Sequence, residues 1–230
     1  MTQGTRRLWL ARHGTTNWNT AQRYCGWSDV PLSRTGRAQA RWLARQLAPI
    51  PLQAIYSSDL SRAHETAAYI AERQVQPVPI SVSEQWRELN FGAWEGLTYD
   101  KIANQFQTQL AFFTDPLHHA PPHGESLTAL LQRLRQALAQ LQAETTEGDI
   151  AIVSHGGPLR ALLCSALHMP LNAQWQLRLD PGSLSILDLL STEQQVTEKA
   201  LQDVFPAGML VKLNIQHPVY TRRTRKIPES

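Results

Sequence analysis

Short apolar segments alternate with amphipathic helical segments along this chain, and this alternation limits the fold more than any other feature of the sequence. Apolar runs at Leu8–Ala11, Ala54–Ser58 and Ile150–Val153 predict strands, and the last has the β-branched character of a central parallel strand. A helical pattern follows each run. The alternation therefore predicts an α/β three-layer α/β/α sandwich with a mostly parallel central sheet.

The remaining elements are predicted from the same patterns. One helix has a candidate N-cap at Thr35 and ends before Pro49, and Ser126 caps another helix that runs to Leu141. Pro79 places an expected strand over residues 78–82 toward an edge of the sheet. The other expected helices are 60–73, 97–113 and 159–167, and the last two expected strands are 184–189 and 210–215.

Length and charge indicate how many domains the chain can form and whether it binds nucleic acid. Its 230 residues, 42% of them apolar and 18% charged, are enough for one well-buried core, so we expect a single domain over residues 1–220. The formal net charge is +3, and a basic stretch within residues 221–230 accounts for it. We interpret that stretch as a solvated C-terminal tail, so the charge does not indicate binding to nucleic acid.

Cysteine usage and the N-terminal sequence indicate the cytoplasm. Cys25 and Cys164 form no CxxC pair and have no histidine at metal-ligand spacing, so we expect reduced thiols. The apolar stretch near the N-terminus is too short for a signal peptide or a membrane span, and no later segment is long enough. We therefore predict a cytoplasmic protein without a membrane partner.

Arginine, histidine and glutamate side chains occur after predicted strands or on the same expected edge of the sheet. Arg12 and His13 follow the first strand, Arg62 follows the second, and His155 follows the central one, while Glu88 stands in a later loop. Because the carboxyl ends of parallel strands meet at one edge, we expect a shared pocket. Guanidinium groups grip phosphate with paired hydrogen bonds, and neutral imidazole attacks phosphorus. The pocket is thus suited to a phosphate dianion.

Two of these side chains also have simpler interpretations. Arg62 stands three residues before Glu65 on a predicted helix, and the two could form only a surface ion pair. Glu88, beside Arg87, could be an exposed charge in a loop. Both alternatives are open as long as each residue is considered alone.

Two further groups of residues stay outside the predicted site. Trp18, Trp27, Trp86 and Trp94 are expected to close loops against the core. The histidines at positions 118, 119 and 123 lack partners at ligand spacing, so we expect a solvated loop and no metal. Their place between Glu88 and the helix capped by Ser126 makes that loop a candidate lid over the substrate.

Several longer segments carry these residues in a characteristic order. They are residues 10–19 (LARHGTTNWN), 26–33 (GWSDVPLS), 56–63 (YSSDLSRA), 87–96 (RELNFGAWEG), 124–126 (GES) and 153–157 (VSHGG). In order, spacing and identity over residues 8–160, they resemble the histidine phosphatase superfamily, in its phosphoglycerate-mutase-like branch. Agreement across all of these segments is far more specific than the Arg-His-Gly tripeptide alone.

The resemblance implies a role for each matching residue. His13 looks like the nucleophile that forms a phosphohistidine, and Glu88 looks like the general acid that later activates water. The groups that the resemblance places around the phosphate are Arg12, Asn19, Arg62, His155 and the backbone of Gly156. It implies neither a metal nor a cofactor.

The sequence favours hydrolysis over transfer between two hydroxyl groups. Cofactor-dependent mutases of the superfamily carry a basic, tyrosine-rich stretch after the acid, whereas Lys101 is the only Lys or Arg between Glu88 and Gln132 here. The segments are similar to those of α-ribazole phosphatases and of broad-specificity bacterial phosphatases. We therefore expect a small-molecule phosphate ester as substrate, with a cofactor-dependent phosphoglycerate mutase as the alternative.

Two further points concern catalysis and assembly. A non-catalytic phosphate-binding module is disfavoured, because such relatives lose a nucleophile, an arginine or the acid, and this chain has all of them. A homodimer is left open by the sequence.

Overall fold

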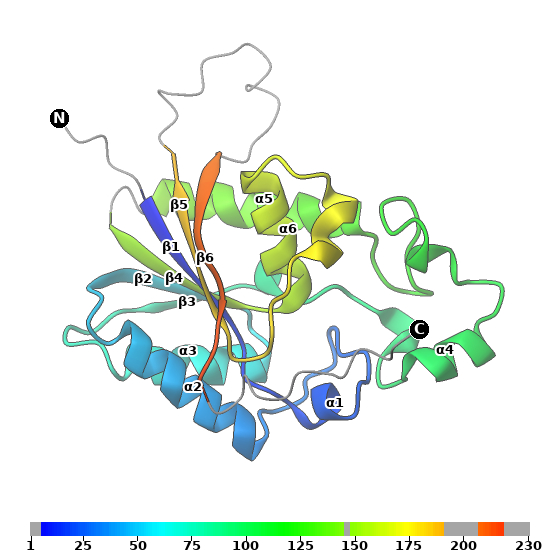
Figure 1. Ribbon diagram of the computed structural model, residues 1–230, viewed down its shortest axis with the longest axis horizontal. Helices are drawn as coiled ribbons and strands as arrows, with labels where there is room; N and C mark the ends of the chain where they lie inside the picture. The colour runs from blue at the N-terminus through cyan, green and yellow to red at the C-terminus, as the bar shows by residue number, and fades with distance from the viewer. Residues whose placement is uncertain (1–5, 145–147, 191–206, 219–230) are drawn as a thin grey trace, which may run out of the picture.

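The computed structural model describes residues 6–144, 148–190 and 207–218, and a six-stranded sheet runs through them in the order β3-β2-β4-β1-β5-β6 (Figure 1). The strands are β1 (Arg6–Arg12), β2 (Leu52–Ser57), β3 (Ile80–Val82), β4 (Asp149–Ser154), β5 (Leu184–Leu189) and β6 (Gly208–Ile215). The pairs β1–β4, β4–β2 and β2–β3 are parallel, and β5 is antiparallel to both of its neighbours, β1 and β6. The prediction of a mostly parallel sheet is confirmed.

Helices cover both faces of this sheet, with α2 and α3 on one side and α5 and α6 on the other (Figure 1). The α-helices are α1 (Asn17–Thr20), α2 (Arg34–Leu47), α3 (Ser61–Ala71), α4 (Tyr99–Gln105), α5 (Leu127–Glu144) and α6 (Gly156–Ala166). The 3-10 helices are η1 (Glu84–Trp86), η2 (Gly92–Trp94), η3 (Ala111–Phe113) and η4 (Leu171–Gln176). The predicted three-layer sandwich is therefore confirmed. No described helix has the length and apolar character needed to cross a lipid bilayer.

The central strands are apolar on both faces because each face borders its own core. In β1, Leu8 and Leu10 lie in the cluster packed by α5 and α6, whereas Trp9 and Ala11 lie in the cluster packed by α2 and α3. The residues of β4 alternate in the same way. Because successive strand side chains point to opposite faces, an uninterrupted apolar run is what a doubly covered strand requires.

Helix starts depend on capping hydroxyl groups. Ser126 is confirmed as a cap of α5, since its Oγ accepts the N–H of Ala129 at 3.2 Å. The predicted cap of α2 at Thr35 is wrong: Ser33 Oγ accepts the N–H of Gly36 at 3.1 Å. Ser33 is favoured as the N-cap because its Oγ also donates to the carbonyl of Thr15, 2.8 Å away in the loop after β1. A tertiary contact thus selects between two good capping residues.

The predicted helix over residues 97–113 is also wrong in extent. α4 ends at Gln105, and only a separate 3-10 turn covers residues 111–113. The rings of Phe106, Phe112 and Phe113 surround the buried indole of Trp94, with Phe113 stacked on it at a centroid distance of 4.9 Å. In a continuous helix Phe106 and Phe113 would lie about 10 Å apart along the axis, and Phe112 and Phe113 would point about 100° apart, so the three rings could not surround one indole.

The predicted edge strand near Pro79 is confirmed as β3, which begins after that proline. Pro79 lacks an N–H but contributes its carbonyl, which accepts the N–H of Ile55 at 3.3 Å. The loop expected between the first strand and the first long helix contains the short helix α1, which the sequence patterns did not indicate.

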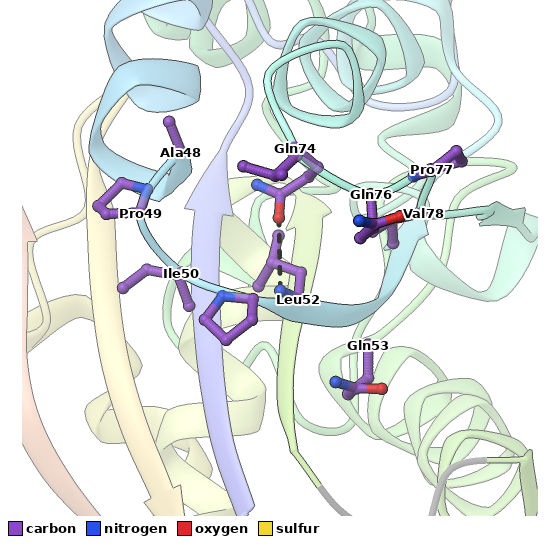
Figure 2. Close-up of a pocket in the computed structure, with 11 residues that line it drawn as sticks. Ala48, Pro49, Ile50, Leu52, Gln53, Gln74, Gln76, Pro77 and Val78 are labelled. Atoms are coloured by element: carbon purple, nitrogen blue, oxygen red, sulfur yellow. Dashed lines mark hydrogen bonds between the residues drawn. The ribbon is translucent and has the colours of Figure 1, made fainter.

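A cavity of about 420 Å³ opens at the end of the sheet where β2 begins. Residues 48–53 and 74–78 line it (Figure 2). The Gln74 side chain joins the two segments, because its Oε1 accepts the N–H of Leu52 at 3.3 Å and its Nε2 donates to the carbonyl of Leu47 at 3.0 Å. Since β2 runs from here toward Ser57, this cavity lies opposite the strand ends that carry the predicted site residues.

Candidate active site

His13 follows β1 directly, and its ring is held in one orientation. Its backbone N–H donates to the carbonyl of Ser154 at 3.0 Å, and its Nδ1 lies 2.7 Å from the carbonyl oxygen of Gly14. Because a carbonyl only accepts, Nδ1 carries the proton and Nε2 keeps its lone pair. Burial, then the charges of Arg62 and Arg12, holds the pKa of His13 well below its ordinary value. The ring is a neutral imidazole with Nε2 available for attack.

His155 caps the start of α6, and its ring centroid lies 4.9 Å from that of His13. Arg62 Nε donates to Nδ1 of His155 at 3.3 Å, so the proton of the neutral ring is on Nε2. Burial, followed by the charge of Arg62, holds the pKa of His155 well below its ordinary value. Its Nε2 is buried and has no hydrogen-bond partner within the described ranges. A buried N–H donor of this kind can donate to an oxygen atom of a bound ligand.

Arg62 is fully buried on α3 and anchors the loop in front of it. Its Nη2 donates to the carbonyl of Gly26 at 2.6 Å, and its Nη1 donates to that of Ser28 at 2.9 Å. The surface ion pair between Arg62 and Glu65 is wrong as an interpretation, because Glu65 pairs with Arg37 at 2.6 Å instead. The fold thus buries the positive charge of Arg62 next to His155.

Arg12, the last residue of β1, points its guanidinium toward the start of α6. Its Nη1 donates to the carbonyl of Leu179 at 2.6 Å, while its buried Nε has no partner in the part of the chain that is described. Burial lowers the pKa of Arg12 to about 10, which leaves it charged at neutral pH. A Cβ on Gly156 would lie 3.3 Å from Cζ of Arg12, so this guanidinium lies against the first turn of α6.

Glu88 lies after η1 and is 8% exposed, so its interpretation as an exposed loop charge is wrong. Its Oε1 accepts two backbone N–H groups, those of Leu89 and Gly157, both at 2.9 Å. A Cβ added to Gly157 would collide with this oxygen. Only glycine at that position lets the carboxylate reach the start of α6.

The described geometry brings five predicted side chains together from four parts of the chain: Arg12, His13, Arg62, Glu88 and His155. The sequence of residues 8–202 matches the family model of the histidine phosphatase superfamily (branch 1). The chain belongs to this superfamily. The predicted membership is confirmed, and the chain is a phosphatase.

Known members of the superfamily agree with this assignment over most of their length. The adenosylcobalamin/α-ribazole phosphatase of Salmonella typhimurium is 32% identical over 184 residues, which are 80% of this chain and 90% of that protein. Phosphoserine phosphatase 1 of Hydrogenobacter thermophilus is 29% identical over 80% of this chain and 86% of its own length. The solved α-ribazole phosphatase of Shigella flexneri matches at a TM-score of 0.77 and 29% identity, covering 91% of this chain and 96% of that one.

Asn19 has a structural partner in this histidine phosphatase. Its Oδ1 accepts the N–H of Thr16 at 2.9 Å, and Thr16 Oγ1 accepts the N–H of Asn19 at 3.2 Å. The two residues form a capping box that starts α1. A contact between Asn19 and phosphate stays a prediction.

The histidine-rich loop of the phosphatase is organised by one carboxylate. His118 Nδ1 lies 3.0 Å from each oxygen of Asp115, and His119 Nδ1 lies 3.4 Å from one of them; both histidines are exposed. The described residues contain no group of three or more His, Cys, Asp or Glu that could hold a metal ion. The role of this loop as a lid stays a prediction.

Arg160 is a residue near the site that the sequence patterns did not single out. Its Nη1 would lie 3.3 Å from a Cβ on Gly156, and its Nε donates to the carbonyl of Leu177 at 2.8 Å. Burial lowers the pKa of Arg160, and its charge in turn lowers that of Arg12. The sequence could have indicated Arg160 by its position four residues after Gly156, which is one turn further along a helix that starts at the site.

Replacing Gly157 with alanine is expected to lower kcat/KM about 10²-fold while the protein stays folded. The new Cβ would displace Oε1 of Glu88, the free end of a flexible side chain, and the surrounding backbone need not move. Steady-state kinetics and thermal unfolding measure the two effects. Gly14→Ala is the contrasting variant, because its Cβ would collide with the backbone of Gly36, and we expect it not to fold. A Gly157→Ala enzyme with wild-type kcat/KM would contradict the role of this contact.

Stability is expected to fall as the pH decreases through 6.5. In the unfolded chain His13 and His155 bind protons near their ordinary pKa of about 6.5, whereas the folded forms, with lowered pKa values, do not. The unfolded state then binds more protons, so the free energy of unfolding falls by up to about 1.4 kcal/mol per pH unit for each histidine. Urea unfolding between about pH 7.5 and about pH 5 measures this slope.

The matched variants for this measurement are two substitutions by glutamine. His13→Gln and His155→Gln should each reduce the slope, because each removes one histidine whose pKa the fold lowers. An equal slope in wild type and His13→Gln would show that His13 is not held neutral by the fold.

Proposed function

We propose that this phosphatase hydrolyses small phosphate monoesters through a phosphohistidine on His13. One observation carries the proposal: the ring of His13, with its Nε2 lone pair, lies 4.9 Å from the ring of His155, and the buried Nε2 of His155 and Nε of Arg12, the residue before His13, have no protein partner among the described residues. A nucleophile next to unsatisfied donors is suited to a phosphoryl group, whose oxygens would satisfy them.

In the first step, Nε2 of His13 attacks phosphorus, and the bond from phosphorus to the ester oxygen breaks. Arg12, Arg62 and His155 donate hydrogen bonds to the phosphoryl oxygens. Glu88 gives its proton to the departing oxygen. Because Oε1 of Glu88 already accepts two backbone N–H groups, the proton that it transfers is held on Oε2.

In the second step, water attacks the phosphohistidine. The Glu88 carboxylate takes a proton from this water, the bond from phosphorus to Nε2 breaks, and the electron pair returns to the imidazole. Inorganic phosphate leaves, and Glu88 is again protonated for the next cycle. The backbone N–H of Gly156, at the start of α6, and the side chain of Asn19 supply further donors to the phosphoryl group.

α-Ribazole 5'-phosphate is the substrate that we propose first. The relatives from Salmonella typhimurium and Shigella flexneri act on α-ribazole phosphate according to their names, and both match this chain over most of its length. The phosphoserine phosphatase relative makes a broader preference for small phosphate esters the second candidate.

Steady-state phosphate release from a panel of esters tests the substrate. The panel contains α-ribazole phosphate, phosphoserine, p-nitrophenyl phosphate, fructose bisphosphates and 3-phosphoglycerate with bisphosphoglycerate. We expect the highest kcat/KM for α-ribazole phosphate. Comparable values for several esters would identify a broad-specificity phosphatase. Isomerisation of phosphoglycerate without net phosphate release would identify a mutase, and no turnover of any ester would favour a phosphate-binding module.

We further propose a cytoplasmic enzyme with one domain over residues 1–220 that acts on small molecules and not on nucleic acid. Both cysteines are free, and burial raises the pKa of Cys25 to about 11, which favours the thiol form. The tail at 221–230 lies outside the described residues. A homodimer is the assembly that we propose to test, by light scattering of the full chain and of a chain that ends at residue 220.

A further inference from the structure

The backbone carbonyl of Glu88 is held from two directions. Trp27 Nε1, in the loop between α1 and α2, donates to this oxygen at 2.9 Å. Arg133 Nη2, on α5, donates to the same oxygen at 2.8 Å. A carbonyl oxygen has two lone pairs, and here each of them receives a donor from a different element of the fold. The main chain at the acid residue is therefore fixed independently of the carboxylate.

Arg133 also grips the chain on both sides of Glu88. Its Nη1 donates to the carbonyl of Gln85 at 2.7 Å, and its guanidinium forms a two-point ion pair with Glu125 at 2.6 and 3.2 Å. Oε1 of Glu125 accepts the N–H of Asn90 at 3.0 Å. Each of the paired side chains is only 14% exposed. One ion pair thus spans the segment from residue 85 to residue 90.

Trp27 is also held by contacts with neighbouring side chains. The Glu95 carboxylate accepts the backbone N–H groups of Trp27 and Ser28 at 2.7 and 2.6 Å. The guanidinium of Arg87 lies over the indole, 4.8 Å from the ring centroid. These contacts orient the indole so that its N–H points at the Glu88 carbonyl.

The loop that carries Trp27 also joins the acid to the phosphate pocket. Arg62 donates to the carbonyls of Gly26 and Ser28, on either side of Trp27. The distance between the buried guanidinium of Arg62 and the main chain of Glu88 is consequently set by a loop of three residues.

We infer that Arg133, together with Trp27, is a positioning residue for the general acid Glu88. The inference rests on the proposed function, in which Glu88 protonates the leaving oxygen. Arg133 acts through the Glu88 main chain, and its ion pair with Glu125 holds the guanidinium in the orientation that this requires.

The leaving group distinguishes this role from a general structural one. An alkoxide must receive a proton as it departs, whereas p-nitrophenolate is stable without one. A displaced acid therefore lowers kcat/KM for an alkyl phosphate and leaves p-nitrophenyl phosphate nearly unaffected. A defect in folding or in phosphate binding lowers kcat/KM for both esters alike.

The test compares glycerol 2-phosphate with p-nitrophenyl phosphate for Arg133→Met and Trp27→Phe. We expect the alkyl-to-aryl ratio of kcat/KM to fall about 30-fold or more in Arg133→Met. Trp27→Phe removes a single N–H and retains an aromatic ring, and we expect a decrease of about 3-fold or more. If Arg133→Met does not fold, Trp27→Phe decides the outcome alone.

The matched control is Arg7→Met. Arg7 forms a two-point ion pair with Asp188, at 2.6 and 2.7 Å, at the opposite end of β1 from the site, and its side chain is more exposed than that of Arg133. We expect this variant to keep the wild-type ratio, with at most a small loss of stability. An unchanged ratio in both Arg133→Met and Trp27→Phe would overturn the inference.

Glu88→Gln separates this inference from the proposed function. We expect Glu88→Gln to lower the ratio more than Arg133→Met does, and the double variant to lose nothing further in the ratio. If Glu88→Gln lowers kcat/KM equally for both esters, Glu88 is not the general acid, and the positioning role of Arg133 is overturned as well. If Glu88→Gln lowers kcat/KM only for the alkyl ester while Arg133→Met changes kcat/KM for neither ester, only the positioning role is overturned.

Discussion

Replacing His13 with alanine is expected to lower the hydrolysis of every ester by about 10⁴-fold or more, which is the scale of removing an enzyme nucleophile. His13 keeps its Nε2 lone pair, and its neighbours Arg12 and His155 each have a buried N–H donor without a partner among the described residues. The variant should not become labelled when mixed rapidly with a phosphate-labelled ester, whereas wild type should form an acid-labile phosphoenzyme.

The matched control for this experiment is His64→Ala, which removes an exposed imidazole from α3. It should retain labelling and turnover. The thermal unfolding of His13→Ala should show a folded protein, because the alanine keeps the backbone bond to Ser154. Persistent labelling of folded His13→Ala would assign the nucleophile to another residue.

Replacing Arg62 with methionine is expected to reduce both activity and stability. The carbonyls of Gly26 and Ser28 would lose their donors inside the protein, as would Nδ1 of His155. Unsatisfied buried groups of this kind should lower the free energy of unfolding by about 3 kcal/mol. Loss of a positive charge at the phosphoryl group should lower kcat/KM by about 10³-fold. Urea unfolding and steady-state kinetics measure the two effects.

Arg37→Met provides the comparison for Arg62→Met. Arg37 binds Glu65 on the surface of the same two-helix layer, and exposed pairs contribute at most about 1 kcal/mol. We expect wild-type kinetics for this variant. Arg62→Lys should restore part of the activity, since it returns the charge without the planar fork. If folded Arg62→Met lost less than tenfold in kcat/KM, Arg62 would have only a structural role.

The sequence predicted the layers of this fold because the relevant signals are local. The alternation in β1, with Leu8 and Leu10 facing one core and Trp9 facing the other, is set by the two-residue repeat of a strand. The capping of α5 by Ser126 involves only neighbouring residues. The site could be predicted in outline because His13 and His155 both follow parallel strands, whose carboxyl ends meet at one edge.

The sequence patterns did not predict helix ends that depend on contacts between distant segments. Ser33 caps α2 because it also contacts the loop after β1, and the segment after Gln105 leaves the helix because its rings pack around Trp94. Neither outcome is visible in helix periodicity, since both depend on where another part of the chain lies.

What the sequence by itself determined is therefore the type and order of the main elements, the family and the residue types of the site. Only the tertiary structure decided which atoms of those residues are available. Nε2 of His13 keeps its lone pair because Nδ1 carries the proton and donates it to the neighbouring carbonyl. Nε2 of His155 carries the proton because Nδ1 accepts a hydrogen bond from Arg62, 93 residues away. Glu88 is held by Arg133, 45 residues further along the chain. Strand and helix periodicity follows from backbone geometry over a few residues, whereas a proton's position follows from a hydrogen bond that exists only after the chain has folded.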